Sequence, residues 1–115
     1  MTESAGTAES NTIETAASIL AEWDLTLAQV QGVLGITSGK PAVLAESLER
    51  ALAVIRLQEA LLAHFSTDGH DRLWLRSPNV RPLFNGDAPI QRLLGGKKDE
   101  LQSLLRIAES MAAGH

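Results

Sequence analysis

Three histidines and one glycine-lysine run are the features of this sequence whose residue types could support chemistry. His64, His70 and His115 do not have the spacing of metal ligands, and no carboxylate arrangement beside them indicates a site. The run at residues 95–98, GGKK, lacks the preceding strand and the full spacing of a phosphate-binding loop. No serine, histidine and aspartate stand in an order that suggests an activated nucleophile. We therefore expect that the chain is not an enzyme and uses no cofactor and no metal.

The length, composition and charge of the chain exclude several kinds of site and partner. The chain has 115 residues, which fit one compact domain, and no cysteine, which excludes disulfides, thiolate zinc sites and cysteine nucleophiles. Its formal net charge of −4 argues against strong autonomous binding to nucleic acid through phosphate contacts. No apolar run approaches the about 20 residues of a membrane-spanning helix, and residues 1–11 lack the basic flank and apolar core of a signal peptide. We expect a cytoplasmic protein with no membrane partner.

The chain must position any binding residues through helices, and the first of these is expected to start at Thr12. Residues 1–11 are polar, small and acidic, and we expect them to form a disordered tail. Apolar residues then recur at spacings of three and four, which predicts a helix that ends near Trp23. These apolar residues are Ile13, Ala16, Ala17 and Leu20.

Residues 25–37, LTLAQVQGVLGIT, resemble the first half of a helix-turn-helix of the Xre type. Thr26 is expected to cap a helix over residues 27–34, and Gly35 to end it in the left-handed conformation. The helix-spaced apolar positions are Leu27, Val30 and Leu34. In the Xre pattern a recognition helix follows, but residues 38–41, SGKP, disfavour one because they combine glycine and proline. The candidate DNA-binding residues of this region are Thr37, Ser38 and Lys40.

Residues 42–65 predict the longest helix, because they contain no glycine or proline and carry two apolar stripes. One stripe comprises Leu44, Leu48, Leu52, Ile55 and Leu62, and the other comprises Val54, Leu57, Leu61 and Phe65. Two stripes predict a helix that is covered on two sides. The charged residues expected on the remaining surface are Glu46, Glu49, Arg50, Arg56 and Glu59. We expect this helix to form the spine of a small bundle, and it could also supply a dimer face.

Residues 73–94 interrupt the helical pattern and hold three of the four prolines. Proline disfavours the helical conformation in the residue before it, so a short helix over residues 70–76 is expected to end ahead of Pro78. Asp87 is expected to cap the next helix, which covers residues 89–94. A final helix is expected from residue 97 to residue 112, with one apolar face made by Leu101, Leu104, Leu105, Ala108 and Met111.

Several motifs of the second half occur in a fixed order. They are Trp74-Leu75, Pro78-Asn79, a Gly-x-x-Pro from Gly86 to Pro89, Leu93-Leu94, a glycine at 95 or 96, and the closing amphipathic helix. In this order residues 74–113 resemble the toxin-binding domain of Xre/MbcA/ParS-type antitoxins, and with the Xre-like first half the resemblance covers nearly the whole chain. Ala88 departs from the pattern, because the family usually has threonine or serine before this proline.

The resemblance implies an all-α fold, a small helical bundle in which a degenerate Xre-like half at residues 12–65 and a toxin-binding half at residues 66–115 form one compact unit. It implies the antitoxin of a type II toxin-antitoxin system that forms homodimers and neutralises a RES-domain toxin that degrades NAD. The C-terminal helix and tail are then expected to occlude the toxin's active site. The expected toxin-binding residues are Trp74, Arg76, Asn79, Arg81, Arg92, Glu109, Met111, Ala112, Ala113, Gly114 and His115.

Several of these residues also have an ordinary structural interpretation. Trp74 is typical of a core, Asn79 after a proline is typical of a turn, and a final helix with one apolar stripe can simply complete a bundle. Two other functions remain open. A helix-turn-helix transcriptional regulator that represses its own operon is the main alternative, although Lys40 is the only basic residue at the expected position of the recognition helix. A helical adaptor with an unrelated partner is the third possibility.

Overall fold

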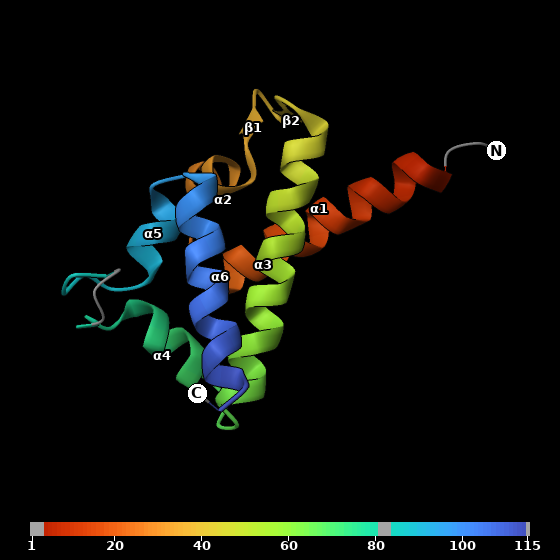
Figure 1. Cartoon of the computed structure of the whole chain (residues 1–115). Helices are drawn as coiled ribbons and strands as arrows, with labels where there is room; N and C mark the ends of the chain where they lie inside the picture. The colour runs from red at the N-terminus through yellow and green to blue at the C-terminus, as the bar shows by residue number, and fades with distance from the viewer. Residues whose placement is uncertain (1–3, 81–83, 115) are drawn as a thin grey trace.

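The chain folds as an all-α protein with one small hairpin, which confirms the expected fold class. The computed structural model describes residues 4–80 and 84–114 (Figure 1). In chain order its elements are α1 (Ser4–Glu22), α2 (Leu27–Leu34), β1 (Ile36–Thr37), β2 (Lys40–Pro41), α3 (Leu44–His64), α4 (His70–Arg76), α5 (Ile90–Leu94) and α6 (Lys98–Ala112). Within the described ranges, no helix combines the length and the apolar character needed to cross a membrane.

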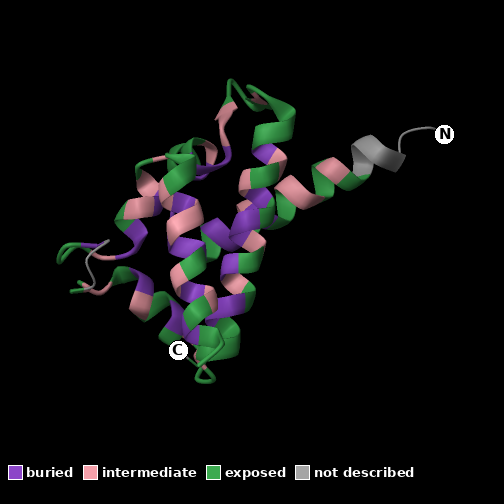
Figure 2. Ribbon diagram, in the orientation of Figure 1, coloured by how far each residue is buried: buried purple, intermediate pink, exposed green. Residues whose placement is uncertain are grey.

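A single core forms where α3, the longest helix, packs against α1 and α6 (Figure 1). The buried residues gather where these helices meet, and the outer side of α3 is largely exposed (Figure 2). The largest fully buried side chains come from every helix: Leu20, Leu34, Val54, Leu57, Leu61, Leu75, Phe84, Ile90, Leu93, Leu101 and Leu104. Because both halves of the chain contribute to this core, they form one unit.

Only one of the two apolar stripes of α3 is buried, whereas the sequence predicted that both would be covered. Of its two apolar stripes, the one that contains Val54, Leu57 and Leu61 is buried as expected. The other, here called the α3 stripe, comprises Leu44, Leu48, Leu52, Ile55 and Leu62. Leu44 is 44% exposed and Leu52 and Leu62 are 52% exposed, so the expected cover over this side is wrong for the single chain. Small residues complete the buried face instead, namely Ser47, Ala51, Ala53 and Ala60.

The first helix begins earlier than the sequence predicted. α1 starts at Ser4, so the expected disorder is wrong for residues 4–11, and residues 1–3 lie outside the described part. The Thr12 hydroxyl donates to the carbonyl of Ala8 at 3.0 Å, which places Thr12 inside the helix and not at its cap. Polar composition did not prevent helix formation, because alanine and glutamate are good helix formers. The N-terminal half of α1 projects away from the bundle (Figure 1).

The second helix confirms the predicted cap and end. The Thr26 hydroxyl accepts from the Gln29 amide at 3.2 Å, and the Gln29 side chain accepts from the Thr26 amide at 2.8 Å, which is a complete capping box. Gly35 ends the helix at φ +72°, in the left-handed region. Leu27, however, is 74% exposed, so its expected place in the apolar face is wrong, and Val33 is buried instead.

A hairpin stands where an Xre-type recognition helix would begin, so the predicted absence of that helix is confirmed. β1 and β2 pair antiparallel, with Ile36 opposite Pro41 and Thr37 opposite Lys40. The two residues between them, Ser38 and Gly39, both have positive φ, at 55° and 80°. This is the conformation that two-residue hairpins favour, and a glycine adopts it without steric cost.

The C-terminal half largely follows the prediction. α4 covers residues 70–76 as expected, and α6 differs from its expected start by one residue. The cap of α5 is the exception: Pro89 occupies the N-cap position and no side chain caps the helix, so the assignment of Asp87 as the cap is wrong. The Asp87 carboxylate lies 4.0 Å from the guanidinium of Arg92 instead.

Candidate functional site

Trp74 links the end of α3 to the segment after α4. The residue is half-buried, and its ring lies between those of Phe65 and Phe84, with centroid distances of 6.3 and 6.0 Å. Phe84 meets it edge-on, an arrangement that aromatic pairs prefer. Trp74 therefore packs against the core and keeps part of its surface accessible, which is compatible with both interpretations of this residue.

Arg76 and Arg92 are both engaged within the chain. The Arg76 guanidinium donates to the carbonyl of Trp23 at 2.6 Å, which ties the end of α4 to the residue that follows α1. A cation at this place also meets the negative end of the α1 dipole. Arg81 lies outside the described residues. Two of the three arginines that were expected to bind the toxin thus have partners inside the chain.

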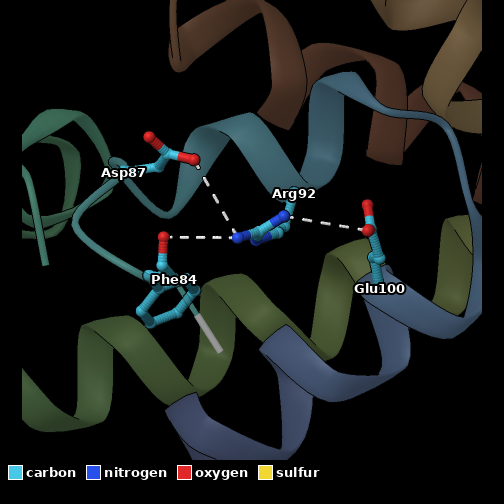
Figure 3. A network of polar contacts seen from close by, with 4 residues as sticks. All are labelled: Phe84, Asp87, Arg92 and Glu100. Atoms are coloured by element: carbon cyan, nitrogen blue, oxygen red, sulfur yellow. Dashed lines mark hydrogen bonds and ion pairs between the residues drawn. The ribbon is translucent and has the colours of Figure 1, made fainter. Parts of the chain in front are cut away.

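Arg92 is the centre of a polar network that joins α5, α6 and the preceding loop (Figure 3). Its guanidinium donates to the carbonyl of Phe84 at 3.2 Å and lies 4.0 Å from the Asp87 carboxylate and 3.8 Å from that of Glu100. Its side chain is only 22% exposed, and its Nε atom is buried without a hydrogen-bond partner among the described residues. The geometry makes Arg92 a clamp for the loop, because the strongest of these contacts is to the backbone.

Asn79 closes the loop that carries these contacts. Its backbone amide donates to the backbone carbonyl of Asp87 at 3.1 Å, and its backbone carbonyl accepts from the backbone amide of Gly86 at 2.8 Å. Gly86 has a φ of +90°, a conformation that glycine adopts without steric cost. The Pro78-Asn79 and Gly-x-x-Pro motifs therefore meet in space at the base of one loop.

The end of α6 is pinned to the end of α3. The carbonyl of Met111 lies 3.0 Å from Nδ1 of His64, and Glu109 forms an ion pair with Arg56 at 2.7 Å. Met111 is only 7% exposed, as expected for the apolar face of the final helix, and this differs from an open contact with a partner. Apolar burial explains the difference, because Met111 continues the stripe of Leu104 and Ala108 on the buried face of α6.

The residues that follow Met111 are accessible. Ala112, Ala113 and Gly114 are exposed, and His115 lies outside the described residues. They stand at the same end of the molecule as α4 (Figure 1). The ring of His64 contacts that of Phe65 at 4.6 Å, and Phe65 in turn contacts Trp74, so the motif region and the end of α6 share one set of packed side chains.

The candidate DNA-binding residues lie at the opposite end of α3. Thr37, Ser38 and Lys40 are all exposed on the hairpin. Their strands are two residues long, and they give no helix or extended ribbon that could enter a groove of DNA.

Within residues 4–80 and 84–114, no group of three or more His, Cys, Asp or Glu side chains is placed to hold a metal ion. The hydrogen bond from the Lys98 ammonium to Glu49 raises the pKa of Lys98 above 10.5, and both residues lie on the exposed surface.

Two features of this surface were missed by sequence reasoning. Arg50, expected on the surface, donates from Nη1 to the carbonyls of Val33 at 3.2 Å and Gly96 at 2.8 Å, and so joins α3 to both halves. The exposed position of the α3 stripe was also missed. The small residues at Ser47, Ala51 and Ala60 were the available signal for the second feature, because helices approach closely only where side chains are small.

Comparison with protein-family models, with curated proteins and with solved structures finds no match to this chain.

Proposed function

We propose that the chain is the antitoxin of a type II toxin-antitoxin system, which binds a RES-domain toxin and blocks its NAD-degrading site. The proposal rests on the resemblance of residues 74–113 to the toxin-binding domain of Xre/MbcA/ParS-type antitoxins. It carries with it a homodimer, a cytoplasmic location and a chain that is not itself an enzyme.

One structural observation supports this proposal above the others. The slim residues Ala112, Ala113 and Gly114 are exposed at a helix end that is held by the His64 contact and by the burial of Met111. A held end loses little conformational freedom when its tip enters a cleft, and such preorganisation favours binding.

The contact around this tip would be made by α4 and the following loop. Leu73 is 63% exposed and Val80 is 94% exposed, and the half-buried Trp74 lies between them in the sequence. Exposed apolar side chains with an aromatic residue among them are typical of the centre of a protein interface. Arg72 is exposed on the same helix and favours an acidic rim on the partner.

The test is co-expression with the protein encoded by the adjacent reading frame, followed by co-purification and measurement of cellular NAD. We expect a stable complex and preserved NAD. Deletion of residues 112–115 removes the tip and leaves Met111 in the core, so the truncated chain should stay folded, bind more weakly and lose its protection of NAD. Two proteins that never associate would sink the antitoxin proposal.

A matched pair of substitutions separates occlusion from simple binding. Ala113→Trp makes the tip too wide for a narrow cleft, whereas Ala113→Ser keeps it slim. We expect loss of neutralisation by the first and full neutralisation by the second. Full neutralisation by both the Ala113→Trp variant and the truncated chain would remove the occlusion mechanism and leave toxin binding by another surface.

The alternative, an autorepressor that reads its operator, lacks a supporting element. The hairpin presents Lys40 as its one basic side chain, and a DNA-reading surface normally needs several. A gel shift with the promoter of the operon, performed with the chain alone and with its toxin complex, tests this alternative. A shift by the chain alone would favour it over the antitoxin proposal.

A further inference from the structure

The outer side of α3 carries an exposed apolar stripe, in which Leu44, Leu52 and Leu62 are each at least 44% exposed. The α3 stripe follows a coiled-coil pattern, with intervals of four, four and three residues from Leu44 through Leu48 and Leu52 to Ile55. Leu62 continues it after seven residues, and Glu59 occupies the turn between. A contiguous apolar patch of this kind on a small protein marks an interaction site.

The charges beside the α3 stripe identify the occupant. Glu49 and Arg56 stand seven residues apart on the same flank of α3, next to α6. In an antiparallel pair of identical helices that is centred between these residues, Glu49 of each copy faces Arg56 of the other. A parallel pair would set Glu49 against the side of α3 that holds Leu44 and Ala51, where no charge complements it.

Existing ion pairs extend this complementarity. Lys98 on α6 contacts Glu49, and Glu109 on α6 contacts Arg56 at 2.7 Å. Across the antiparallel contact, Lys98 and Glu49 of one copy would be followed by Arg56 and Glu109 of the other. The charges in this row alternate in sign. A self-complementary surface of this type is what a two-fold symmetric interface requires.

The two ends of the α3 stripe are also complementary in shape. In the same register Leu62 of one copy lies opposite Leu44 of the other. A hollow of about 380 Å³ adjoins Leu44, between the projecting half of α1, the hairpin and α3. Its apolar lining comes from Ile13, Ile36, Pro41 and Leu44. This hollow gives the Leu62 side chain a place to enter.

We propose that the α3 stripe binds a second copy of this chain in an antiparallel orientation, with Glu49 of each copy paired to Arg56 of the other. The antitoxin proposal already carries a homodimer, and what is added here is the face and the orientation that form it. Because this face differs from the one proposed for toxin binding, failure of the dimer and failure of toxin binding are distinguishable. α3 is about 30 Å long and its exposed stripe about 10 Å wide. This patch is smaller than the about 800 Å² per partner of a standard interface, so the dimer is a weak one.

Sedimentation velocity of the full chain from about 1 to about 500 µM tests the dimer, because dissociation constants of weak complexes fall in this range. We expect a species of twice the 12.3 kDa chain mass that dissociates on dilution. Leu52→Glu should weaken the dimer by about 50-fold, since it removes an apolar contact from both copies. Leu27→Glu, which alters an exposed leucine on α2, should leave it unchanged. Glu59→Leu should tighten it.

Spin labels test the orientation, since the chain has no cysteine of its own. A label on Ala63→Cys, an exposed position near the end of α3, should give a distance of about 30 Å between copies in the antiparallel dimer. A parallel dimer would give about 10 Å. Circular dichroism confirms that each variant is folded. A chain that is monomeric at all concentrations, a dimer that Leu52→Glu does not weaken, or the short label distance would each overturn the proposal.

Discussion

Replacing Arg92 by methionine separates a structural role of this side chain from a partner-binding one. Methionine keeps an unbranched apolar stem and removes the guanidinium. That group donates to the Phe84 carbonyl from a side chain that is 22% exposed, and a hydrogen bond to a charged group contributes about 1.5 to 3 kcal/mol. The same carbonyl also accepts from the Asp87 amide at 2.9 Å, so it does not become unpaired. The loss therefore falls at the lower end of that range.

Two smaller effects adjust this value. The ion pairs of Arg92 are long, at 4.0 Å to Asp87 and 3.8 Å to Glu100, and the Asp87 side chain is 63% exposed, so each contributes between about 0 and 1 kcal/mol. In the opposite direction, methionine removes the buried Nε that lacks a partner among the described residues. We expect a net destabilisation of about 1 to 2 kcal/mol, which lowers the Tm of a domain of this size by about 5 to 10 °C.

The assay is thermal unfolding of Arg92→Met and of Arg92→Lys, with affinity for the partner toxin measured well below both unfolding temperatures. Lysine keeps the charge near the two carboxylates but lacks the planar fork, so Arg92→Lys should be intermediate in stability. Both variants should keep most of their affinity. An unchanged Tm together with an affinity lost at least tenfold would refute the clamp and show that Arg92 contacts the partner.

Three further predictions concern local structure. Thr26→Ala removes the hydroxyl half of the capping box with Gln29 and should cost about 1 kcal/mol in urea unfolding; a change under a few tenths would contradict the cap. Gly35→Ala should cost about 1 to 2 kcal/mol, because alanine is strained at a φ of +72°; an equally stable variant would show that the helix end rearranges. The Lys98 pKa is raised above 10.5 chiefly by Glu49, so its contribution to stability is present below pH 10.5 and is lost as the pH rises through the folded pKa. NMR titration should show that pKa falling in Glu49→Gln, and an unshifted value in both proteins would exclude the interaction.

Local signals in the sequence were sufficient for most of the fold. The ends of α2 were predicted to the residue because Thr26 and Gly35 act on their immediate neighbours. Glycine and proline near Lys40 likewise sufficed to exclude a recognition helix. The start of α1 was missed since its first turns carry no strong cap signal and no apolar stripe, and composition alone does not distinguish a polar helix from a tail.

Long-range contacts account for the part of the candidate site that sequence did not predict. Arg50 meets the Gly96 carbonyl across 46 positions in sequence, and His64 meets the Met111 carbonyl across 47. No periodicity reports such a pairing, because an arginine on a helix flank has the same pattern whether it meets water or a backbone carbonyl. For the same reason the sequence could not show whether Arg76 and Arg92 contact a partner or make the internal contacts that the structure has.

The α3 helix shows why counting large apolar residues is a poor guide to which side faces the core. A helix that lies between two others needs small side chains at the closest approach, and α3 places Ser47, Ala51 and Ala60 there. Large leucines such as Leu52 and Leu62 then remain outside, although half of their surface is exposed. An exposed leucine stripe of this length favours aggregation unless something covers it. If a second copy covers it, the expectation of a helix covered on two sides is wrong for the single chain and correct for the dimer.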